Sequence, residues 1–576
     1  MVGAIALDID HELHQLFGFA EFRAGQREAV EAVLEGRDVL AIMPTGSGKS
    51  LCYQLPALIS DGLTVVVSPL IALMQDQYQA LRARGFDGVE MLASSMSAEE
   101  VRATLGRIGE GATRLVYVAP ERFSSRRFLE ALAAAGVARL AVDEAHCLSE
   151  WGHDFRPDYR RLADVRERLG SPPTIALTAT ATPRVARDIV SALGLRDPAL
   201  PRTGFDRPNL FFEVIRVGGQ AGKEKVLAAL LRDSARLPAV VYCGRRKACE
   251  QVAAALRGAG VKAEPYHAGL AQSVRSDVLQ GFLGGSVEVV AATTAFGMGI
   301  DKADVRSVIH WVIPASPEEY YQQAGRAGRD GLPARCTLLY SPSDKGLIVY
   351  FINRAKLSPG DLQAAHRACA EVASPEGVFS LSDRDLPGDE PRVALAVLER
   401  AGALELFPAP TGHVTGRLAH RRLAAKHVAA AMIAGRRVER QRWDRLKAID
   451  AYATTESCRR EALLGYFGDK PAERDPEVCC DGHGGPATQA VPGIDVNAAV
   501  LAAVDETLGS AGRSRLVAIL RGSRAKALKS AGHDRLSSHG ALVHMTQDDV
   551  MAAVDRLIDN GTLRKTGGLY PLVKRA

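Results

Sequence analysis

Short apolar segments of strand length recur along the first 340 residues of the chain, and helix-length amphipathic stretches separate them. Five of these segments lie at 39–43, 63–67, 115–118, 140–142 and 174–177, and five more lie at 239–242, 263–266, 287–291, 307–311 and 336–340. Apolar strands that alternate with helices are typical of parallel sheets covered by helices. The sequence therefore predicts two α/β lobes, joined near residues 202–208.

The composition excludes several classes of chain. At 576 residues the chain is too long for a single hydrophobic core, and it predicts about three to five domains. The hydrophobic and charged fractions, 47% and 24%, are those of a folded protein rather than a disordered or collagen-like one. A net charge of +5 is too small to indicate a polyanionic partner by itself, so the distribution of charge must decide.

The sequence contains neither an export signal nor a membrane span. Its N-terminus lacks the basic and apolar regions of a signal peptide, and no apolar run approaches the ~18 residues that cross a bilayer. Nine cysteines in a chain of this length suggest reduced thiols. We therefore expect a cytoplasmic protein without a membrane partner, associated with the nucleoid if its source is bacterial.

A glycine-rich segment, MPTGSGKS at 43–50, follows the first apolar segment and precedes a helical stretch. In this position backbone N–H groups can surround a phosphate, Lys49 adds a positive charge and the Ser50 hydroxyl can bind Mg²⁺. The alternative is an ordinary glycine-rich turn, because Met43 stands where a generic phosphate loop has glycine. The candidate nucleotide ligands are Thr45, Gly46, Gly48, Lys49 and Ser50.

An acidic motif, DEAH at 143–146, follows the strand expected at 140–142. Two adjacent acids at a strand end can divide the work of hydrolysis, with Asp143 directed toward Mg²⁺ and Glu144 toward the attacking water. A lone acidic pair is usually part of a solvated loop. Together with the glycine-rich segment upstream, the pair favours nucleotide hydrolysis.

Two arginines lie three residues apart in the segment QQAGRAGR at 322–329. On a helix this spacing would place Arg326 and Arg329 on one face, where both guanidinium groups could contact a γ-phosphate across a cleft. The alternative is a pair of surface charges. The intervening glycines favour close approach to another backbone or to a ligand.

Taken in order, these segments resemble the superfamily 2 helicases, and specifically the RecQ family of DNA helicases. The resemblance covers about residues 17–340. It includes the segment FGFAEFRAGQ, which resembles the adenine-recognition motif of the family and implies that Gln26 reads the base edge with Arg23 nearby. Further matching segments lie at 68–77, 117–122, 177–182, 205–210, 242–247 and 266–270.

The resemblance also implies nucleotide contacts from Asp301, at the end of the segment VAATTAFGMGID, and from Gln322. An acidic residue commonly follows this glutamine in the family, whereas this chain has Gln323.

The segment CLSEWGHDFRPDY at 147–159 resembles the aromatic-rich loop that links DNA contact to hydrolysis in RecQ enzymes. Aromatic side chains can stack on unpaired bases, and basic side chains can reach phosphates. The alternative is that the aromatic rings pack the loop onto the core. The implied DNA-binding residues are Trp151, His153, Phe155 and Arg156.

The segment CRREALLGYFG, which begins at Cys458, resembles the first half of the zinc module of the family. In the second half, where the family has three cysteines spaced by two residues, Cys480 and His483 keep the spacing and Glu477 stands at the remaining position. The resemblance implies Zn²⁺ bound by Cys458, Cys480 and His483, with Cys479 or Glu477 as the fourth ligand. We include Cys479 in the predicted set. The alternative is a loop of buried thiols without a metal.

Basic residues gather near the C-terminus, where seven of them and one acidic residue lie between positions 511 and 540. Such a run is usually a solvated face, but this stretch resembles the winged-helix RQC domain of the family, which grips DNA phosphates. The resemblance implies DNA contacts from Arg521, Arg524, Lys526 and His533. The hairpin expected at 566–570 is short, which counts against a role in separating strands.

The predicted fold class is α/β, with two RecA-like parallel-sheet lobes followed by a helical zinc-binding-type module and a C-terminal winged helix. A helix, a glycine stop and a short strand at 393–406 suggest a small winged-helix-like insertion within 380–416. The expected domains are lobe 1 at 1–205, lobe 2 at 206–345, a helical linker with the insertion at 346–434, the zinc-binding-type module at 435–490 and the winged helix at 491–576.

The resemblance as a whole implies an ATP-dependent 3′ to 5′ DNA helicase that acts in recombination and repair and requires ATP, Mg²⁺ and Zn²⁺. The implied partners are single-stranded DNA and duplex or branched DNA. A single-strand DNA-binding protein is a candidate partner, and we expect a monomer. The alternatives are an RNA helicase, a translocase that does not unwind, and a winged-helix regulator whose nucleotide lobes act as a switch.

Overall fold

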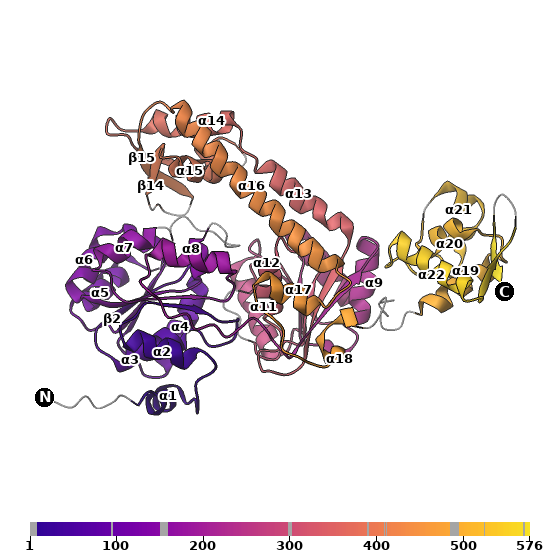
Figure 1. The fold of residues 1–576 in the computed structure, drawn as a ribbon, viewed down its shortest axis with the longest axis horizontal. Coiled ribbons are helices and arrows are strands. Elements are labelled where there is room, and N and C mark those ends of the chain that lie inside the picture. The colour runs from indigo at the N-terminus through magenta and orange to yellow at the C-terminus, as the bar shows by residue number, and fades with distance from the viewer. Residues whose placement is uncertain are drawn as a thin grey trace.

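The computed structural model contains two α/β lobes, a pair of long helices that carries a small inserted module, and a separate C-terminal domain (Figure 1). No helix of the described residues is long and apolar enough to cross a membrane. The structure describes residues 8–93, 96–149, 159, 161–297, 302–388, 391–407, 409, 412–483, 495–523, 525–567 and 571–576.

Lobe 1 is built on a six-stranded parallel sheet in the order β1-β6-β5-β2-β4-β3. Most of its strands are buried along their length because helices cover the sheet. The strands are β1 (Val39–Ile42), β2 (Leu63–Val67), β3 (Val89–Leu92), β4 (Leu115–Val118), β5 (Val137–Val142) and β6 (Thr174–Thr178). The helices are α1 (Ile9–Phe17), α2 (Gln26–Leu34), α3 (Leu51–Ile59), α4 (Ile71–Ala83), α5 (Ala98–Gly109), α6 (Arg126–Ala135), α7 (Leu162–Arg168) and α8 (Pro183–Leu193).

Lobe 2 repeats this plan with a second six-stranded parallel sheet in the order β7-β12-β11-β8-β10-β9. The prediction of two parallel-sheet lobes is therefore confirmed. The strands are β7 (Leu210–Arg216), β8 (Ala239–Tyr242), β9 (Ala263–Tyr266), β10 (Val289–Ala292), β11 (Ser307–His310) and β12 (Ala334–Tyr340). The helices are α9 (Gln220–Leu230), α10 (Arg246–Gly258), α11 (Gln272–Gly284) and α12 (Pro317–Ala324).

Two helices, α13 (Lys345–Arg354) and α16 (Ala425–Thr454), pack side by side and extend away from lobe 2 (Figure 1). The base of α16 is fixed to lobe 2 because Asp450 accepts hydrogen bonds from Tyr340 Oη at 2.7 Å and Lys345 Nζ at 2.9 Å. Nearby, the hydroxyl groups of Tyr452 and Tyr320 lie 2.9 Å apart.

The inserted module lies between these two helices in the sequence and at their far end in space (Figure 1). Its three antiparallel strands pair in the order β13-β15-β14, which together with the helices is the arrangement of a winged helix. Its wing reaches lobe 1, where the Arg161 guanidinium lies 5.9 Å from the centre of the Phe407 ring. The elements are α14 (Pro359–Val372), β13 (Val378–Ser382), α15 (Pro391–Arg400), β14 (Leu404–Phe407) and β15 (His413–Leu418).

The chain continues into the zinc-module helices α17 (Arg459–Tyr466) and α18 (Pro476–Cys479) and then into the C-terminal domain. That domain docks on lobe 2 beside α9, where Gly218 N donates to His544 O at 2.6 Å and Lys225 Nζ donates to Ala541 O at 2.7 Å. Its elements are α19 (Val496–Glu506), α20 (Arg513–Leu520), α21 (Lys526–Ser530), α22 (Gln547–Asp559), β16 (Leu563–Lys565) and β17 (Val573–Arg575).

Candidate functional site

The glycine-rich loop lies between β1 and α3, where backbone N–H groups at a helix N-terminus favour a phosphate. Gly46 and Gly48 have φ angles of 83° and 77°, which glycine adopts without strain. Lys49 Nζ donates to the carbonyl oxygens of Met43 at 3.2 Å and Pro44 at 3.3 Å. The ammonium group is therefore held over the loop, where a phosphate could replace these carbonyl contacts.

Gln26 and Arg23 lie against the same loop. Gln26 Nε2 donates to the carbonyl oxygens of Ser47 and Gly48 at 2.9 and 3.0 Å, and its Oε1 accepts from Arg23 N at 2.8 Å. Arg23 Nη1 donates to Gly46 O at 2.6 Å. The amide that the resemblance assigns to adenine is thus connected directly to the phosphate loop.

The acidic pair follows β5 and lies close to Lys49. The pKa of the Asp143 carboxyl is raised to about 7, mainly by burial and in addition by the neighbouring Glu144, whereas Lys49 opposes the shift. Burial also lowers the pKa of Lys49, although Glu144 and Asp143 counteract this. A carboxyl that is costly to ionise when no cation is present fits a Mg²⁺ site, because a divalent cation would stabilise the anion.

Glu144 has a left-handed backbone with φ of 48°, which is strained for a residue other than glycine. Its carboxylate oxygen Oε2 lies 3.3 Å from His146 Nδ1, which is also 3.1 Å from Thr178 Oγ1 at the end of β6. This chain of contacts joins the acidic motif to the segment 177–182. The turn directs the Glu144 carboxylate toward the space between the lobes, because Glu144 lines the cleft there.

The two arginines of lobe 2 lie opposite the glycine-rich loop, but the expectation that they share a helix is wrong. Helix α12 ends at Ala324, and Arg326 and Arg329 lie in the turns that follow. The helix ends at its C-cap Gly325, and within the following turn Gly328 has φ of 54°, where a Cβ would lie 2.4 Å from the Asn209 amide nitrogen. The close approach that the glycines suggested is therefore made to the backbone and Asn209.

The arginine side chains nevertheless point into the gap between the lobes. The Cγ of Arg329 would lie 3.4 Å from a Cβ built on Gly46 of the phosphate loop. Arg326 Nη1 donates to Gly297 O, and Arg326 lines the same cleft as Glu144 and Gln322. Both guanidinium groups thus lie at the interface where a nucleotide on lobe 1 would present its outer phosphates.

Arg207 is a further residue of this interface, and sequence reasoning assigned it no role. Its Nη1 donates to Thr45 O of lobe 1 at 3.3 Å and to Gly325 O of lobe 2 at 3.2 Å, and its Nη2 donates to Gly328 O at 2.9 Å. Its place in the matched segment FDRPNL was the available signal. A single guanidinium therefore links the phosphate loop to the arginine turn.

A cleft of about 770 Å³ opens between the lobes and below the α13–α16 pair. Lobe 1 contributes Pro69, Leu70 and Glu144 to its wall, and lobe 2 contributes Gln322 and Arg326. The predicted DNA-contact residues Trp151, His153, Phe155 and Arg156, the nucleotide residue Asp301 and the basic residue Arg524 lie outside the described residues.

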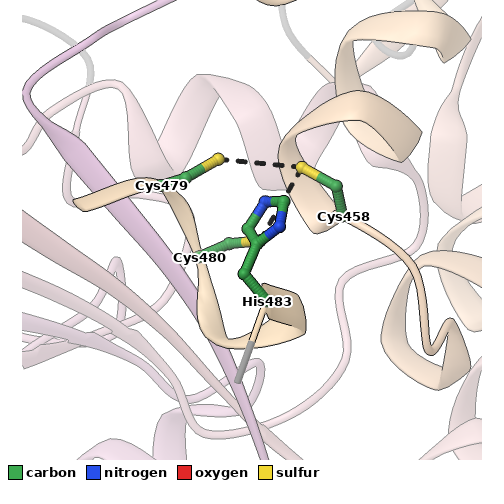
Figure 2. A group of neighbouring side chains, drawn as sticks. All are labelled: Cys458, Cys479, Cys480 and His483. Carbon is green, nitrogen blue, oxygen red and sulfur yellow. Dashed lines mark hydrogen bonds between the residues drawn. The ribbon is translucent and has the colours of Figure 1, made fainter. Parts of the chain in front are cut away.

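The structure brings Cys458, Cys479, Cys480 and His483 together, with all four ligand atoms within 4.8 Å of one another (Figure 2). The Sγ atom of Cys458 lies 3.7 Å from that of Cys479 and 3.8 Å from that of Cys480. Two thiolates bound to one tetrahedral Zn²⁺ at about 2.3 Å would lie about 3.8 Å apart. The four residues therefore fit a zinc ion.

Backbone N–H groups also point at the sulfur atoms of this cluster. Arg459 N lies 3.3 Å from Cys480 Sγ, and Glu461 N lies 3.4 Å from Cys458 Sγ. Such donors stabilise thiolates and orient metal ligands. Glu477 is exposed and is not part of the cluster, whereas Cys479 is buried in it.

The described basic residues that were predicted to contact DNA from the C-terminal domain differ in their surroundings. Arg521 is half-buried, and its Nε donates to Met545 O at 3.1 Å beside Gly218 of lobe 2. Lys526 is exposed at the start of α21, and His533 is half-buried. The structure thus places Arg521 at the contact between domains and Lys526 in solvent.

Four family models match the chain in order. They are DEAD/DEAH box helicase at 23–189, helicase conserved C-terminal domain at 222–331, RecQ zinc-binding at 420–483 and RQC domain at 493–575. These matches leave residues 332–419 uncovered, which include the inserted module.

Curated relatives match nearly the whole chain. The ATP-dependent DNA helicase RecQ of Bacillus subtilis is 34% identical over 566 residues, which are 97% of this chain and 80% of the relative. The ATP-dependent DNA helicase RecQ of Pasteurella multocida is 33% identical over 97% of this chain and 75% of the relative. The probable ATP-dependent DNA helicase RecS of Bacillus subtilis is 34% identical over 83% of this chain and 92% of the relative.

Proposed function

Because the chain belongs to the RecQ family of ATP-dependent DNA helicases, we propose that it uses ATP hydrolysis between its lobes to move along one DNA strand and unwind a duplex. The chain is an ATP-dependent DNA helicase of the RecQ type that binds nucleic acid, ATP, Mg²⁺ and Zn²⁺. The 3′ to 5′ direction and roles in recombination and repair are typical of the family.

The observation that carries the mechanism is the contact between the phosphate loop and the arginine turn. Arg207 bridges Thr45 of the loop and Gly325 of the turn, and Arg329 lies over Gly46. A triphosphate on the loop would therefore meet cations from both lobes. Because hydrolysis removes the charge that both lobes share, it would weaken the contact and let the lobes separate.

We assign roles to the residues of this interface as follows. Gln26 and Arg23 hold the adenine side, while Thr45, Gly46, Gly48, Lys49 and Ser50 hold the phosphates. Asp143 positions Mg²⁺, which neutralises phosphate charge when bound, and Glu144 accepts a proton from the attacking water. Arg326 and Arg329 stabilise the charge of the transferred phosphoryl group, and Gln322 and Asp301 complete the lobe 2 side.

We propose that Cys458, Cys479, Cys480 and His483 are the four zinc ligands and that the site is structural. The position supports this role, because helix α17 next to the site anchors the segment between the lobes. Arg460, with 0% of its surface exposed, donates to Asp206 at 2.7 Å and to Arg207 O at 2.8 Å. The metal would therefore hold in place the segment that carries Arg207.

We propose single-stranded DNA and duplex or branched DNA as substrates, with contacts from Trp151, His153, Phe155 and Arg156 and from Arg524, Lys526 and His533. Arg521 was also predicted to contact DNA, but it faces lobe 2 in the structure. We further propose a cytoplasmic, nucleoid-associated monomer that works with a single-strand DNA-binding protein. Nine free cysteines support a reducing compartment.

We also propose domain boundaries after residues 205, 345, 434 and 490, of which the third falls within the continuous helix α16. Sheet membership supports the first two, because every strand of the first sheet precedes residue 205 and every strand of the second lies between 206 and 345.

The decisive experiment is Lys49→Ala with parallel assays of ATP hydrolysis and strand separation. Removing the ammonium group should lower both activities by at least about a hundredfold, because the phosphates lose a buried positive charge. Lys262→Ala is the matched control, since Lys262 is exposed and pairs only with Glu288 among the ion pairs found. Unwinding that survives in the Lys49 variant would rule out the mechanism, and stronger ATPase stimulation by RNA than by DNA would rule out the substrate.

A further inference from the structure

The α13–α16 pair lines the interlobe cleft opposite the catalytic residues. Phe351 of α13 and Arg442 and Arg445 of α16 lie in the wall of the same cleft as Glu144 and Arg326. The Phe351 side chain is 54% exposed, which is unusual for a phenylalanine beside a cleft of this size. The helix pair therefore adds an aromatic ring and two cations to a space already bounded by both lobes.

The middle of α16 is strongly basic. Residues 436–447 contain six basic side chains and two acidic ones. At 100° per residue, Arg442 and Arg445 share the side of α16 that also carries the buried residues Gln441 and Ile449, and Arg437 lies at the edge of this side. Arg436 and Arg440 lie on the opposite side. The cations that border the cleft thus form a defined flank of the helix.

Lobe 1 presents positive charge toward this flank. Burial lowers the pKa of Arg184 on α8, and the nearby Arg437 guanidinium lowers it further. Arg187 on α8 has the same effect on Arg184, and Asp188 opposes it. On the same side of α16 as Arg445, Gln441 is 5% exposed and its Nε2 has no hydrogen-bond partner among the described residues. Arginines that face one another across a gap favour a polyanion between them.

We propose that the α13–α16 pair forms a third wall of the channel for the translocating DNA strand, with Arg437, Arg442 and Arg445 on its phosphates and Phe351 stacked on a base. A positively charged groove with an aromatic platform is the combination that binds single strands without sequence preference. The inference rests on the proposed function, because it names a further contact surface for the same strand. It explains why the cleft reaches from the catalytic carboxylate to the helix pair.

The charge contacts are tested with the full chain and a fluorescein-labelled oligothymidine, by anisotropy at several salt concentrations. Arg442→Ala combined with Arg445→Ala should weaken binding by about tenfold and lower the slope of log affinity against log salt by about 0.7 for each lost phosphate contact. Arg436→Ala combined with Arg440→Ala is the matched control on the other side of α16 and should leave both quantities unchanged. Lysine at positions 442 and 445 should restore most of the affinity, since the charge is kept.

The proposed stacking of Phe351 on a base is tested with one variant and one matched control. Phe351→Ala should weaken binding by about fivefold, because base stacking on an aromatic ring is lost. Tyr350→Ala should not, since Tyr350 is equally exposed, at 53%, but lies outside the cleft wall. If the double variant at Arg442 and Arg445 and its control bind the oligonucleotide with equal affinity and equal salt dependence, the proposal that the helix pair contacts the DNA strand is wrong. Failure of the unaltered chain to bind the oligonucleotide would instead overturn the proposed function.

Discussion

At the scale of single residues, Asp143 lowers the stability of the nucleotide-free protein when its buried carboxyl ionises, although the ionised form is the one that would bind Mg²⁺. Its pKa in the folded chain is raised to about 7, above the ordinary value of 3.8, mainly by burial. Between pH 3.8 and about 7, the folded state therefore keeps the proton on Asp143, whereas the unfolded state has lost it. The nucleotide-free protein gains stability as pH falls through 7 and loses it as pH rises.

Asp143→Asn should abolish this dependence of stability on pH, and it should also abolish ATP hydrolysis. The amide cannot ionise. Above pH 7, in the absence of Mg²⁺ and nucleotide, the free energy of unfolding of the variant should therefore exceed that of the unaltered chain by on the order of 1–3 kcal/mol. ATP hydrolysis should fall to background because the anion that positions Mg²⁺ is gone. Denaturant unfolding on both sides of pH 7 measures the first effect, and an unchanged pH dependence in the variant would contradict the assignment.

At the zinc site, the sequence alone did not decide which residue is the fourth ligand. The resemblance to the family implied Cys458, Cys480 and His483 as ligands but left Cys479 and Glu477 open, because spacing alone does not say which neighbouring side chain turns inward. The short helix α18 decides, since it buries Cys479 at its last residue and leaves Glu477 in solvent.

Substitutions at these two positions should therefore have opposite results. Cys479→Ser should lower zinc affinity by at least about tenfold and lower the thermal midpoint, because metal binding is coupled to folding of the module. Glu477→Gln should retain about one zinc per chain. Metal content after dialysis against a mild chelator measures the difference, and loss of zinc from the Glu477 variant alone would reverse the assignment.

At the scale of elements, apolar runs predicted the two sheets but missed one strand in each. The missed strands, β3 and β7, contain Glu90 and Glu213, which interrupt the apolar pattern. Glu213 is accommodated in the sheet because it accepts from Arg236 at 2.8 Å and from Thr337 at 2.5 Å. The partners that make these acids acceptable lie far away in sequence, so no local pattern could reveal them.

The arginine turn illustrates the same limit. The spacing of Arg326 and Arg329 suggested a helix face, but Asn209 and the Leu332 carbonyl group crowd Gly328 and hold a turn instead. Arg207 then connects this turn to the phosphate loop through backbone carbonyl groups, which leave no trace in side-chain patterns. The sequence pattern thus indicated which arginines to consider, but it did not predict the backbone that holds them.

Arg207→Lys tests the importance of this connection. A lysine has one terminal nitrogen and cannot serve carbonyl groups of both lobes as the guanidinium does. The turnover number of DNA-stimulated ATP hydrolysis should fall by about tenfold or more, with a smaller change in the ATP concentration at half-maximal rate. Steady-state kinetics separate the two quantities, and a change confined to ATP affinity would place Arg207 in binding rather than in the coupling of the lobes.

At the scale of the whole molecule, the C-terminal domain is held on lobe 2 by a close backbone contact that we expect to depend on pH. A Cβ on Gly222 of α9 would lie 2.6 Å from the His544 backbone, so only glycine permits this approach. The pKa of His544 is lowered to about 4, mainly by burial and in addition by the nearby Lys225 ammonium. The imidazole is therefore neutral in the docked state at neutral pH.

Docking should weaken as the solution is acidified. A detached His544 takes up a proton near its ordinary pKa of 6.5, whereas the docked residue resists protonation until about 4. Between these values the detached state binds more protons, so the docking equilibrium constant should fall by up to about tenfold per pH unit. The contact is thus complete above 6.5 and lost progressively below it.

Small-angle scattering across this pH range should show the radius of gyration increase as the domain separates from α9. His544→Gln should flatten the response, because the amide does not titrate, and Gly222→Val should give the extended form at every pH by steric exclusion. A radius that stays constant on acidification in the unaltered chain, while the valine variant is extended, would show that the hydrogen bonds from Gly218 N and Lys225 Nζ hold the domain regardless of the charge on His544.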